Sequence, residues 1–262
     1  MRLRRPLWAM DAGGEMLVET HWPGDGRYAL AMAAAEVDRL ERMLSRILPD
    51  SEVSRLNRAR RMEVGEDLAR VLTAALELRD RTGGRFDPCA GGGIEWDPET
   101  RVARLDPGVA IDLGGVAKGD AADRACAILA KVGPCLVDLG GDVAVAGTPE
   151  AGSWPVGVDC GSRELSLALQ RGGMATSGID RRRRRGGDAV ARHAVDPATG
   201  RPSRTDLLRA TAVAGSAAEA DALATALLIA GEEAARDLAT ALGVPAVLVT
   251  ADGRMALTGG LA

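Results

Sequence analysis

This chain contains two copies of a four-residue segment whose residue types could bind a charged ligand. Residues 112–115 read Asp-Leu-Gly-Gly, residues 138–141 repeat them, and the segment between predicts one helix. A double glycine after an apolar strand lets the backbone turn sharply and lets another group approach its amides. When a helix follows, those amides lie at its positive end, which suits a phosphate. Lys118 adds a cation, so this corner predicts a site for a phosphorylated ligand, although it matches neither the P-loop nor the dinucleotide-binding glycine pattern.

A second candidate site lies on a helix that the sequence predicts to begin at Ser216. Ser216 and Glu219 form a capping box, which places Asp221 and Thr225 on one face near the positive end of the helix. A carboxylate and a hydroxyl side by side are hard oxygen donors that suit Mg²⁺. The alternative interpretation is purely structural: an Asp that is favoured by the helix dipole and a Thr that bonds back to its own helix.

His193 is one of two histidines and stands at a predicted junction between a strand and a turn. A histidine there could be a general base, or it could be a structural residue. The run Arg181–Arg185 could bind phosphate or nucleic acid, but no aromatic residues interleave with it, which favours a solvated loop. We assign no role to His21.

The elements that must position these residues alternate irregularly along the chain, which favours an α+β fold over a doubly wound sheet. Hydrophobic periodicity and turn residues predict the positions of these elements. The predicted helices are 27–48, 66–82, 116–131, one from 216 and another after it. The predicted strands are 15–22, short strands near 103 and 111, 136–139, 143–146, 154–158, 165–169, 193–196, 210–214, 246–250 and one after 253. Residues 50–57 read as a polar loop with a turn of helix, and the stretch after 169 reads as flexible and basic.

The bulk properties limit the function classes. The 262 residues, taken as a single domain over 1–262, can bury a substantial core. The net charge of −4 predicts no nucleic-acid or membrane-surface partner, and no apolar run predicts a transmembrane segment. The basic N-terminus lacks the apolar stretch of a signal peptide, and the four cysteines show no metal-ligand spacing. We therefore expect a cytoplasmic protein with reduced thiols.

Taken in order, seven segments resemble the FAD:protein FMN transferase (ApbE) family over nearly the whole chain. Together they are specific, although no one of them is decisive. The segments are 50–57 (DSEVSRLN), 86–88 (FDP), 112–119 (DLGGVAKG) with Asp123, 139–142 (LGGD), 175–178 (ATSG), 193–202 (HAVDPATGRP) and 220–226 (ADALATA).

The resemblance implies a two-lobed fold of mixed sheets flanked by helices, with a flavin cleft between the lobes. Members of the family bind FAD and Mg²⁺ and move the FMN half onto a Thr or Ser hydroxyl of an acceptor flavoprotein, releasing AMP. By position, the metal ligands would be Asp221 and Thr225 with the backbone carbonyl of Gly115. The FAD contacts would be Met10, Phe86, Asp87, Asp112, Lys118 and Val195. His193 is our hypothesis for the base that takes the proton of the hydroxyl.

Two other functions remain open from the sequence. Water could replace the hydroxyl, which would make the protein a Mg²⁺-dependent FAD pyrophosphatase, or the chain could be a non-catalytic flavin-binding protein. This chain also departs from the family: its Met-Gly-Thr motif reads Met10-Asp11-Ala12 here.

Overall fold

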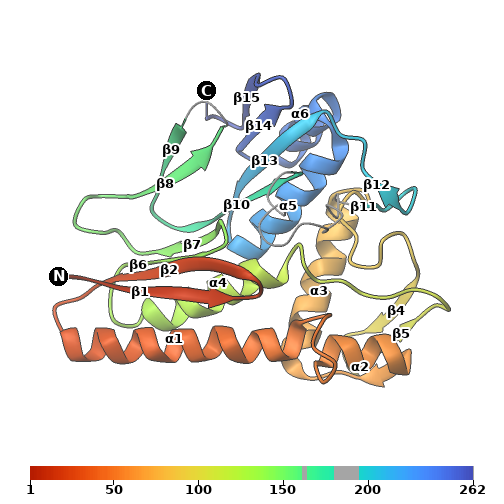
Figure 1. Cartoon of the computed structure of the whole chain (residues 1–262), viewed down its shortest axis with the longest axis horizontal. Coiled ribbons are helices and arrows are strands. Elements are labelled where there is room, and N and C mark those ends of the chain that lie inside the picture. The colour runs from red at the N-terminus through yellow and green to blue at the C-terminus, as the bar shows by residue number, and fades with distance from the viewer. Residues whose placement is uncertain (161–163, 180–194, 262) are drawn as a thin grey trace, which may run out of the picture.

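The computed structural model of the chain describes residues 1–160, 164–179 and 195–261, and its centre is an eight-stranded sheet (Figure 1). The strands lie in the order β1-β2-β6-β7-β10-β13-β14-β15, and each is antiparallel to its neighbours. Their bounds are β1 Arg2–Ala9, β2 Ala12–Glu19, β6 Cys135–Leu139, β7 Asp142–Ala146, β10 Gly172–Gly178, β13 Leu207–Ala214, β14 Ala246–Thr250 and β15 Met255–Thr258.

Three helices cover one face of this sheet: α1 (Pro23–Leu44), α4 (Ala117–Leu129) and α5 (Ala217–Ala230). α4 packs between α1 and α5 and lies on β6 and β7, while α5 lies on β10 and β13 (Figure 1). A further helix, α6 (Glu232–Leu242), packs on α5 and the last two strands. The first turns of α4 and α5 lie close together, since a Cβ atom added at Gly119 would be 2.3 Å from the Ala217 carbonyl oxygen.

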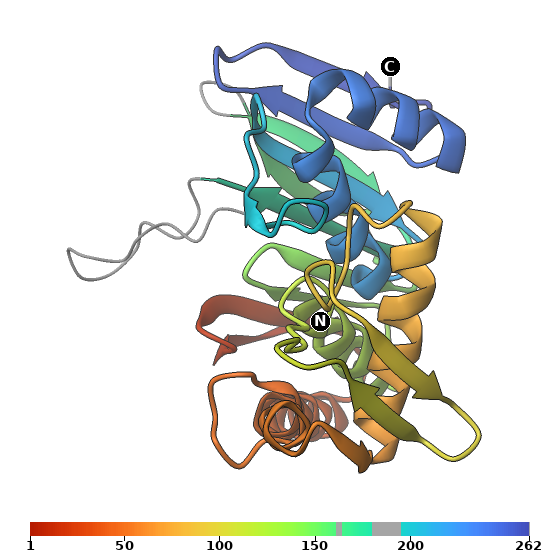
Figure 2. The ribbon, with the colours of Figure 1, turned by 90° about the vertical axis from the view of Figure 1, so that its right-hand side faces the viewer.

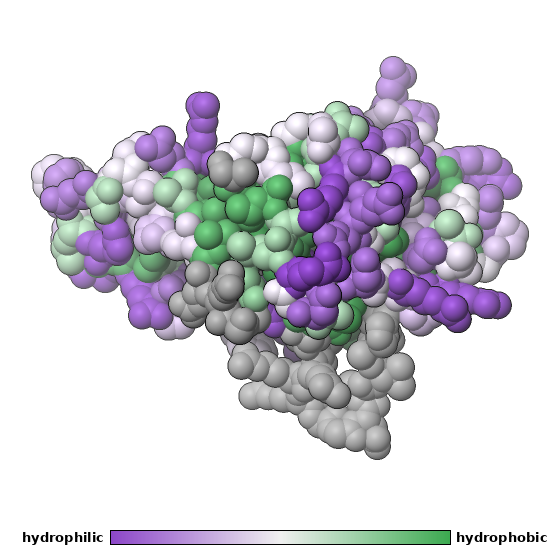
Figure 3. All heavy atoms as spheres, turned by 90° about the horizontal axis from the view of Figure 1, so that it is seen from above, coloured by the Kyte–Doolittle hydropathy of each residue, from purple (hydrophilic) through white to green (hydrophobic). Residues whose placement is uncertain are grey.

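The opposite face of the sheet is covered by a hairpin of β8 (Trp154–Asp159) and β9 (Glu164–Leu169). Successive side chains of a strand point to opposite faces, and β14 shows this: Val247 and Val249 pack beneath the hairpin, whereas Leu248 faces α5. Figure 3 looks down on the molecule from the β14–β15 side and shows an apolar area beside polar side chains.

A smaller unit stands beside the helical face. It contains the sheet β3-β5-β4, with β3 Arg61–Glu63, β4 Ile94–Asp97 and β5 Val102–Leu105. The helices α2 (Glu52–Ala59) and α3 (Glu66–Arg81) belong to it, and Figure 2 shows α3 running along one side of the molecule. The two-residue strands β11 (Val195–Asp196) and β12 (Arg201–Pro202) form a separate hairpin.

The predicted α+β class is confirmed, and most predicted elements exist with shifted ends. The helix predicted over 27–48 is Pro23–Leu44, because Pro23 occupies its first turn, where proline needs no amide partner. The strand predicted over 15–22 is Ala12–Glu19. The alternation of Leu165, Leu167 and Leu169 is confirmed on β9, with Leu169 the most buried of the three.

Several elements differ from the predictions. Residues 50–57 hold more than the predicted turn of helix: Ser51 caps α2, which is eight residues long, by accepting from the Ser54 amide (3.0 Å). Ile111 is not in a strand; its backbone is instead held by both ends of the Asn57 amide (2.8 and 3.0 Å). The stretch after 169 contains β10, and the N-terminus forms β1, which we did not predict.

Candidate active site

The helix that carries Asp221 and Thr225 begins as the sequence predicts. Ser216 is the N-cap of α5 and its hydroxyl accepts from the Glu219 amide (3.1 Å), while the Glu219 carboxylate accepts from the Gly215 amide (3.3 Å). Asp221 is buried with 4% of its surface exposed. The four-residue spacing therefore puts the Asp221 carboxylate and the Thr225 hydroxyl on one face, one helical turn apart.

The first double glycine lies against Thr225. A Cβ atom added at Gly115 would stand 3.2 Å from Thr225 Oγ1 and 3.1 Å from Phe86 Cε2. Ser177, from β10, shares a hydrogen bond with Thr225 (3.0 Å between the two hydroxyl oxygens). The turn at residues 112–115, here called the Gly115 corner, thus contacts the Thr225 hydroxyl. Ser177 adds a second hydroxyl, to which the sequence predictions give no role.

Lys118 contacts two carboxylates: that of Asp142, which follows the second double glycine, and that of Asp221 on α5. Its ammonium contacts Asp142 and lies 3.4 Å from the Asp221 carboxylate. Burial by itself would lower the pKa of Lys118, but the charges of Asp142 and Asp221 outweigh it and raise that pKa. Burial, reinforced by the charge of Asp142, raises the pKa of Asp221 to about 7. With both carboxyl groups ionised, the cluster carries one uncompensated negative charge in a buried setting.

The two copies of the repeat also share a local structure. In each, the aspartate accepts from an amide of its own double glycine: Asp112 from Gly114 (2.9 Å) and Asp138 from Gly141 (2.7 Å). Both amides therefore donate within their own corners in this structure. This differs from the expectation that the double-glycine amides lie open to a phosphate. Asp112 also pairs with Arg46 (2.8 Å), a contact that the sequence did not predict.

The loop after α3 is tied to the same corner. The Asp112 amide donates to the Pro88 carbonyl (2.8 Å), and buried Phe86 lies beneath Gly115. Asp87 accepts from the amides of Cys89 and Gly91 (both 2.8 Å), so its carboxylate shapes the loop. Phe86 therefore lies at the Gly115 corner, whereas Asp87 reaches that corner through the loop that it holds.

The remaining predicted residues are less directly placed. Met10 is in the β1–β2 turn with a positive φ of 53°, in the hairpin whose Ala12 lies against Gly140. Val195 is 42% exposed on β11, in the hairpin whose Pro197 packs on Gly91. His193 and the run 181–185 lie outside the described residues, so their predicted roles stay predictions.

Asp142 is a functional candidate that is not among the site residues predicted from the sequence. Its carboxylate is buried (1% exposed) and contacts the only cation of the cluster among the described residues. The available signal was the repeat itself: Asp142 takes the place after the second double glycine that Val116 takes after the first. A buried polar side chain at a corner shared with Lys118 is a typical feature of a binding site.

The residues present fit a divalent ion with oxygen ligands. A buried carboxylate and a neighbouring hydroxyl supply hard donors, and ionisation of Asp221 gives the Lys118–Asp142–Asp221 cluster an excess negative charge that favours a cation. No group of three or more His, Cys, Asp or Glu side chains suited to a metal occurs within the described part of the chain. A site here would thus take few side-chain ligands, as Mg²⁺ commonly does, with water and phosphate oxygens completing the shell.

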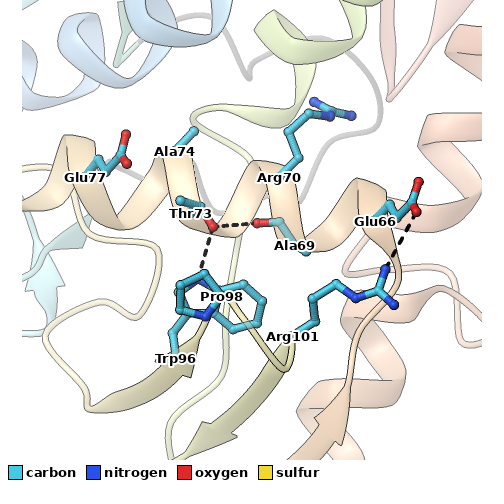
Figure 4. Close-up of a pocket in the computed structure, with 9 residues that line it drawn as sticks. All are labelled: Glu66, Ala69, Arg70, Thr73, Ala74, Glu77, Trp96, Pro98 and Arg101. Carbon is cyan, nitrogen blue, oxygen red and sulfur yellow. Dashed lines mark hydrogen bonds and ion pairs between the residues drawn. The ribbon is translucent and has the colours of Figure 1, made fainter.

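A groove elsewhere on the molecule is separate from this site. It has a volume of about 430 Å³ and lies between α3 and the β4–β5 strands (Figure 4). Trp96 donates to Thr73 across it (3.0 Å), and Glu66 pairs with Arg101 at one end (3.9 Å). None of the residues that line it belongs to the corner around Gly115.

The structure is thus an α+β protein in which a carboxylate, a hydroxyl and a lysine lie together at a double glycine. The sequence profile of the ApbE family matches residues 12–96 and 92–248. The chain is 32% identical to the FAD:protein FMN transferase of Rhodobacter capsulatus, over 92% of this chain and 54% of that protein. It is 26% identical to the protein of the same name from Haemophilus influenzae, over 72% of this chain and 69% of that protein. This chain belongs to the ApbE family.

Solved structures agree with this fold. The ApbE protein of Thermotoga maritima superposes with a TM-score of 0.86 at 24% identity, covering 98% of this chain and 97% of that one. The flavin transferase ApbE of Vibrio cholerae superposes with a TM-score of 0.80 at 20% identity, covering 98% and 96%. The alignment with the Rhodobacter relative spans about half of that protein's length (54%). Among the described residues, no helix has the length and apolarity that crossing a bilayer requires.

Proposed function

We propose that this chain is an FAD:protein FMN transferase: it moves the FMN half of FAD onto a Thr or Ser hydroxyl of an acceptor flavoprotein and releases AMP. The observation that carries the proposal is the convergence of Gly115, Thr225, Lys118 and Asp221 at one corner. Family membership and the names of the curated relatives support it.

In this proposal, Asp221, Thr225 and the Gly115 carbonyl would hold Mg²⁺, which when bound would supply a Lewis acid to neutralise charge on the diphosphate. Lys118 lies beside the same carboxylate, so its ammonium can contact a phosphate oxygen and stabilise the departing AMP. Asp142 holds that ammonium in place. Phe86 offers an apolar ring beneath the corner, beside Gly115.

The other proposed flavin contacts come from three segments around the corner. Asp112 is half-exposed, and its pairing with Arg46 leaves it at the surface of the corner. Asp87 shapes the loop between Phe86 and the β11 hairpin, to which Val195 belongs. Met10 belongs to the β1–β2 turn. We propose His193 as the base that takes the proton of the acceptor hydroxyl, since it stands in the family segment 193–202.

One assay separates the transferase from the pyrophosphatase and from a non-catalytic binder. The purified protein is given FAD and Mg²⁺, with and without acceptor and with and without EDTA, and AMP is quantified. We expect AMP only when acceptor and metal are both present. AMP and free FMN without acceptor would indicate hydrolysis, and bound flavin without AMP would indicate a carrier. The Asp221→Asn variant should abolish the metal response.

A further inference from the structure

Asp123 makes an unusual contact between the two helices of the site. It lies on α4, yet its two carboxylate oxygens accept from the Ala217 amide (2.8 Å) and the Ala218 amide (2.9 Å) of α5. These are the first two amides of α5, which have no partner inside their own helix. Because 94 residues separate Asp123 from Ala217, this is a tertiary contact in which one helix caps another.

The remaining amides at this helix end are satisfied from within α5. Ser216 takes the Glu219 amide through its hydroxyl (3.1 Å) and the Ala220 amide through its carbonyl (3.1 Å). The start of α5 is therefore held in two ways that can be separated by mutation. Ser216 stabilises the helix itself, and Asp123 fixes the helix against α4.

The backbones of α4 and α5 come very close at this point. A Cβ atom added at Gly119 would lie 2.3 Å from the Ala217 carbonyl oxygen, so only glycine permits this approach. Gly119 directly follows Lys118, whose ammonium lies 3.4 Å from Asp221. The same helix crossing thus determines how far Lys118 is from Asp221. It also determines how Thr225, one turn further along α5, faces Gly115.

We propose that Asp123 is a positioning residue for the metal site: by holding the start of α5 against α4, it sets Asp221 and Thr225 relative to Lys118 and Gly115. This inference rests on the proposed function, because it takes these residues to bind Mg²⁺. Mg²⁺ requires near-ideal octahedral geometry with ligand distances of about 2.0–2.1 Å, so a shift of a few tenths of an ångström between the helices weakens binding. The negative charge of Asp123 also suits the positive end of α5.

The test compares Asp123→Asn with Ser216→Ala by titration calorimetry, with Mg²⁺ alone as the probe. Both variants remove hydrogen bonding from the same helix end, but only the first loosens its attachment to α4. We expect both to lower the unfolding midpoint, and only Asp123→Asn to weaken Mg²⁺ binding, by roughly tenfold. At saturating Mg²⁺ the kcat of this variant for AMP release should return towards the wild-type value, because no reacting group has been removed.

Three results would overturn the proposal. Unchanged Mg²⁺ affinity in Asp123→Asn would show that the contact does not position the ligands. Equal weakening in Ser216→Ala would show that helix stability alone matters. Absence of Mg²⁺ binding by the wild-type protein would remove the proposed metal site itself, and this is distinguishable because no variant is needed to see it. Should Asp123→Asn fail to fold, Asp123→Ser, which is smaller and also uncharged, provides the same comparison.

Discussion

Replacing Gly115 by alanine perturbs the site at its tightest point. The added Cβ would stand 3.2 Å from Thr225 Oγ1 and 3.1 Å from the Phe86 ring, whereas ordinary contact distances are 3.4–4 Å. Either the hydroxyl or the corner must therefore move by a few tenths of an ångström. Such a shift exceeds the tolerance of about 0.2 Å within which metal–ligand distances normally vary.

We expect Gly115→Ala to weaken Mg²⁺ binding by about tenfold, or about 1.4 kcal/mol. The overpacking should also cost about 1 kcal/mol of unfolding free energy, because Phe86 is buried beside the new methyl group. Calorimetric Mg²⁺ titration measures the first quantity, and urea denaturation in EDTA measures the second. The larger effect on metal binding distinguishes a displaced ligand from a general loss of stability.

A matched control is available at Gly24, in the first turn of α1. A Cβ atom there would meet nothing within 4 Å, so Gly24→Ala should leave Mg²⁺ binding unchanged and slightly stabilise the protein. If Gly115→Ala binds Mg²⁺ as tightly as the wild type, the reasoning that places Gly115 and Thr225 on one ion is refuted.

Three further predictions follow from the buried contacts. Lys118→Met leaves Asp142 and Asp221 without their ammonium, so the metal-free protein should lose roughly 3 kcal/mol of stability; calorimetric scans should then show a larger stabilisation by Mg²⁺ than in the wild type, and an equal one would contradict this. The pKa of Asp221 is raised to about 7, so the stability that this group contributes is full below its unfolded pKa of about 4 and is lost as the pH rises through 7. Asp221→Asn should therefore flatten the dependence of the unfolding midpoint on pH between pH 4 and 8 in EDTA. A pH profile as steep as that of the wild type would argue against this assignment. Asn57→Ala should cost about 1–3 kcal/mol in urea denaturation, because the backbone of Ile111 loses both of its partners; an unchanged midpoint would show that water replaces them.

The start of α5 was predictable because its signals are local. The Ser216–Glu219 capping box, the spacing of Asp221 and Thr225 and the apolar run after them all act within one helix. The double-glycine corner was visible for the same reason. These short-range patterns determine which residues can share a face. They predicted the double-glycine corner and the Asp221–Thr225 pair as two separate halves of a site, without their relative position.

The junction of the two halves was not predictable from residue types. Lys118 meets Asp142 across 24 residues and Asp221 across 103 residues, and such contacts depend on strand order and helix crossing. Only the family resemblance suggested that the halves meet. Asp123 illustrates the limit best, because its position within α4 gives no indication that it binds the amides of another helix.

The missed strands have a different cause. β10 reads Gly-Gly-Met-Ala-Thr-Ser-Gly, with few β-branched residues, but it is held by hydrogen bonds to β7 on one side and β13 on the other. β1 is an edge strand with several arginines and a proline, a composition that suits an edge and obscures the alternation of a strand. In both cases tertiary pairing outweighs local propensity.

The most direct test of the proposed transfer is the intact mass of an acceptor flavoprotein after incubation with this chain, FAD and Mg²⁺. We predict that the acceptor gains the mass of one FMN less one water, with one AMP released per modified chain, and that replacing its target Thr or Ser by alanine abolishes both. An unchanged acceptor mass accompanied by AMP and free FMN would contradict the transferase and show that the corner directs FAD to water.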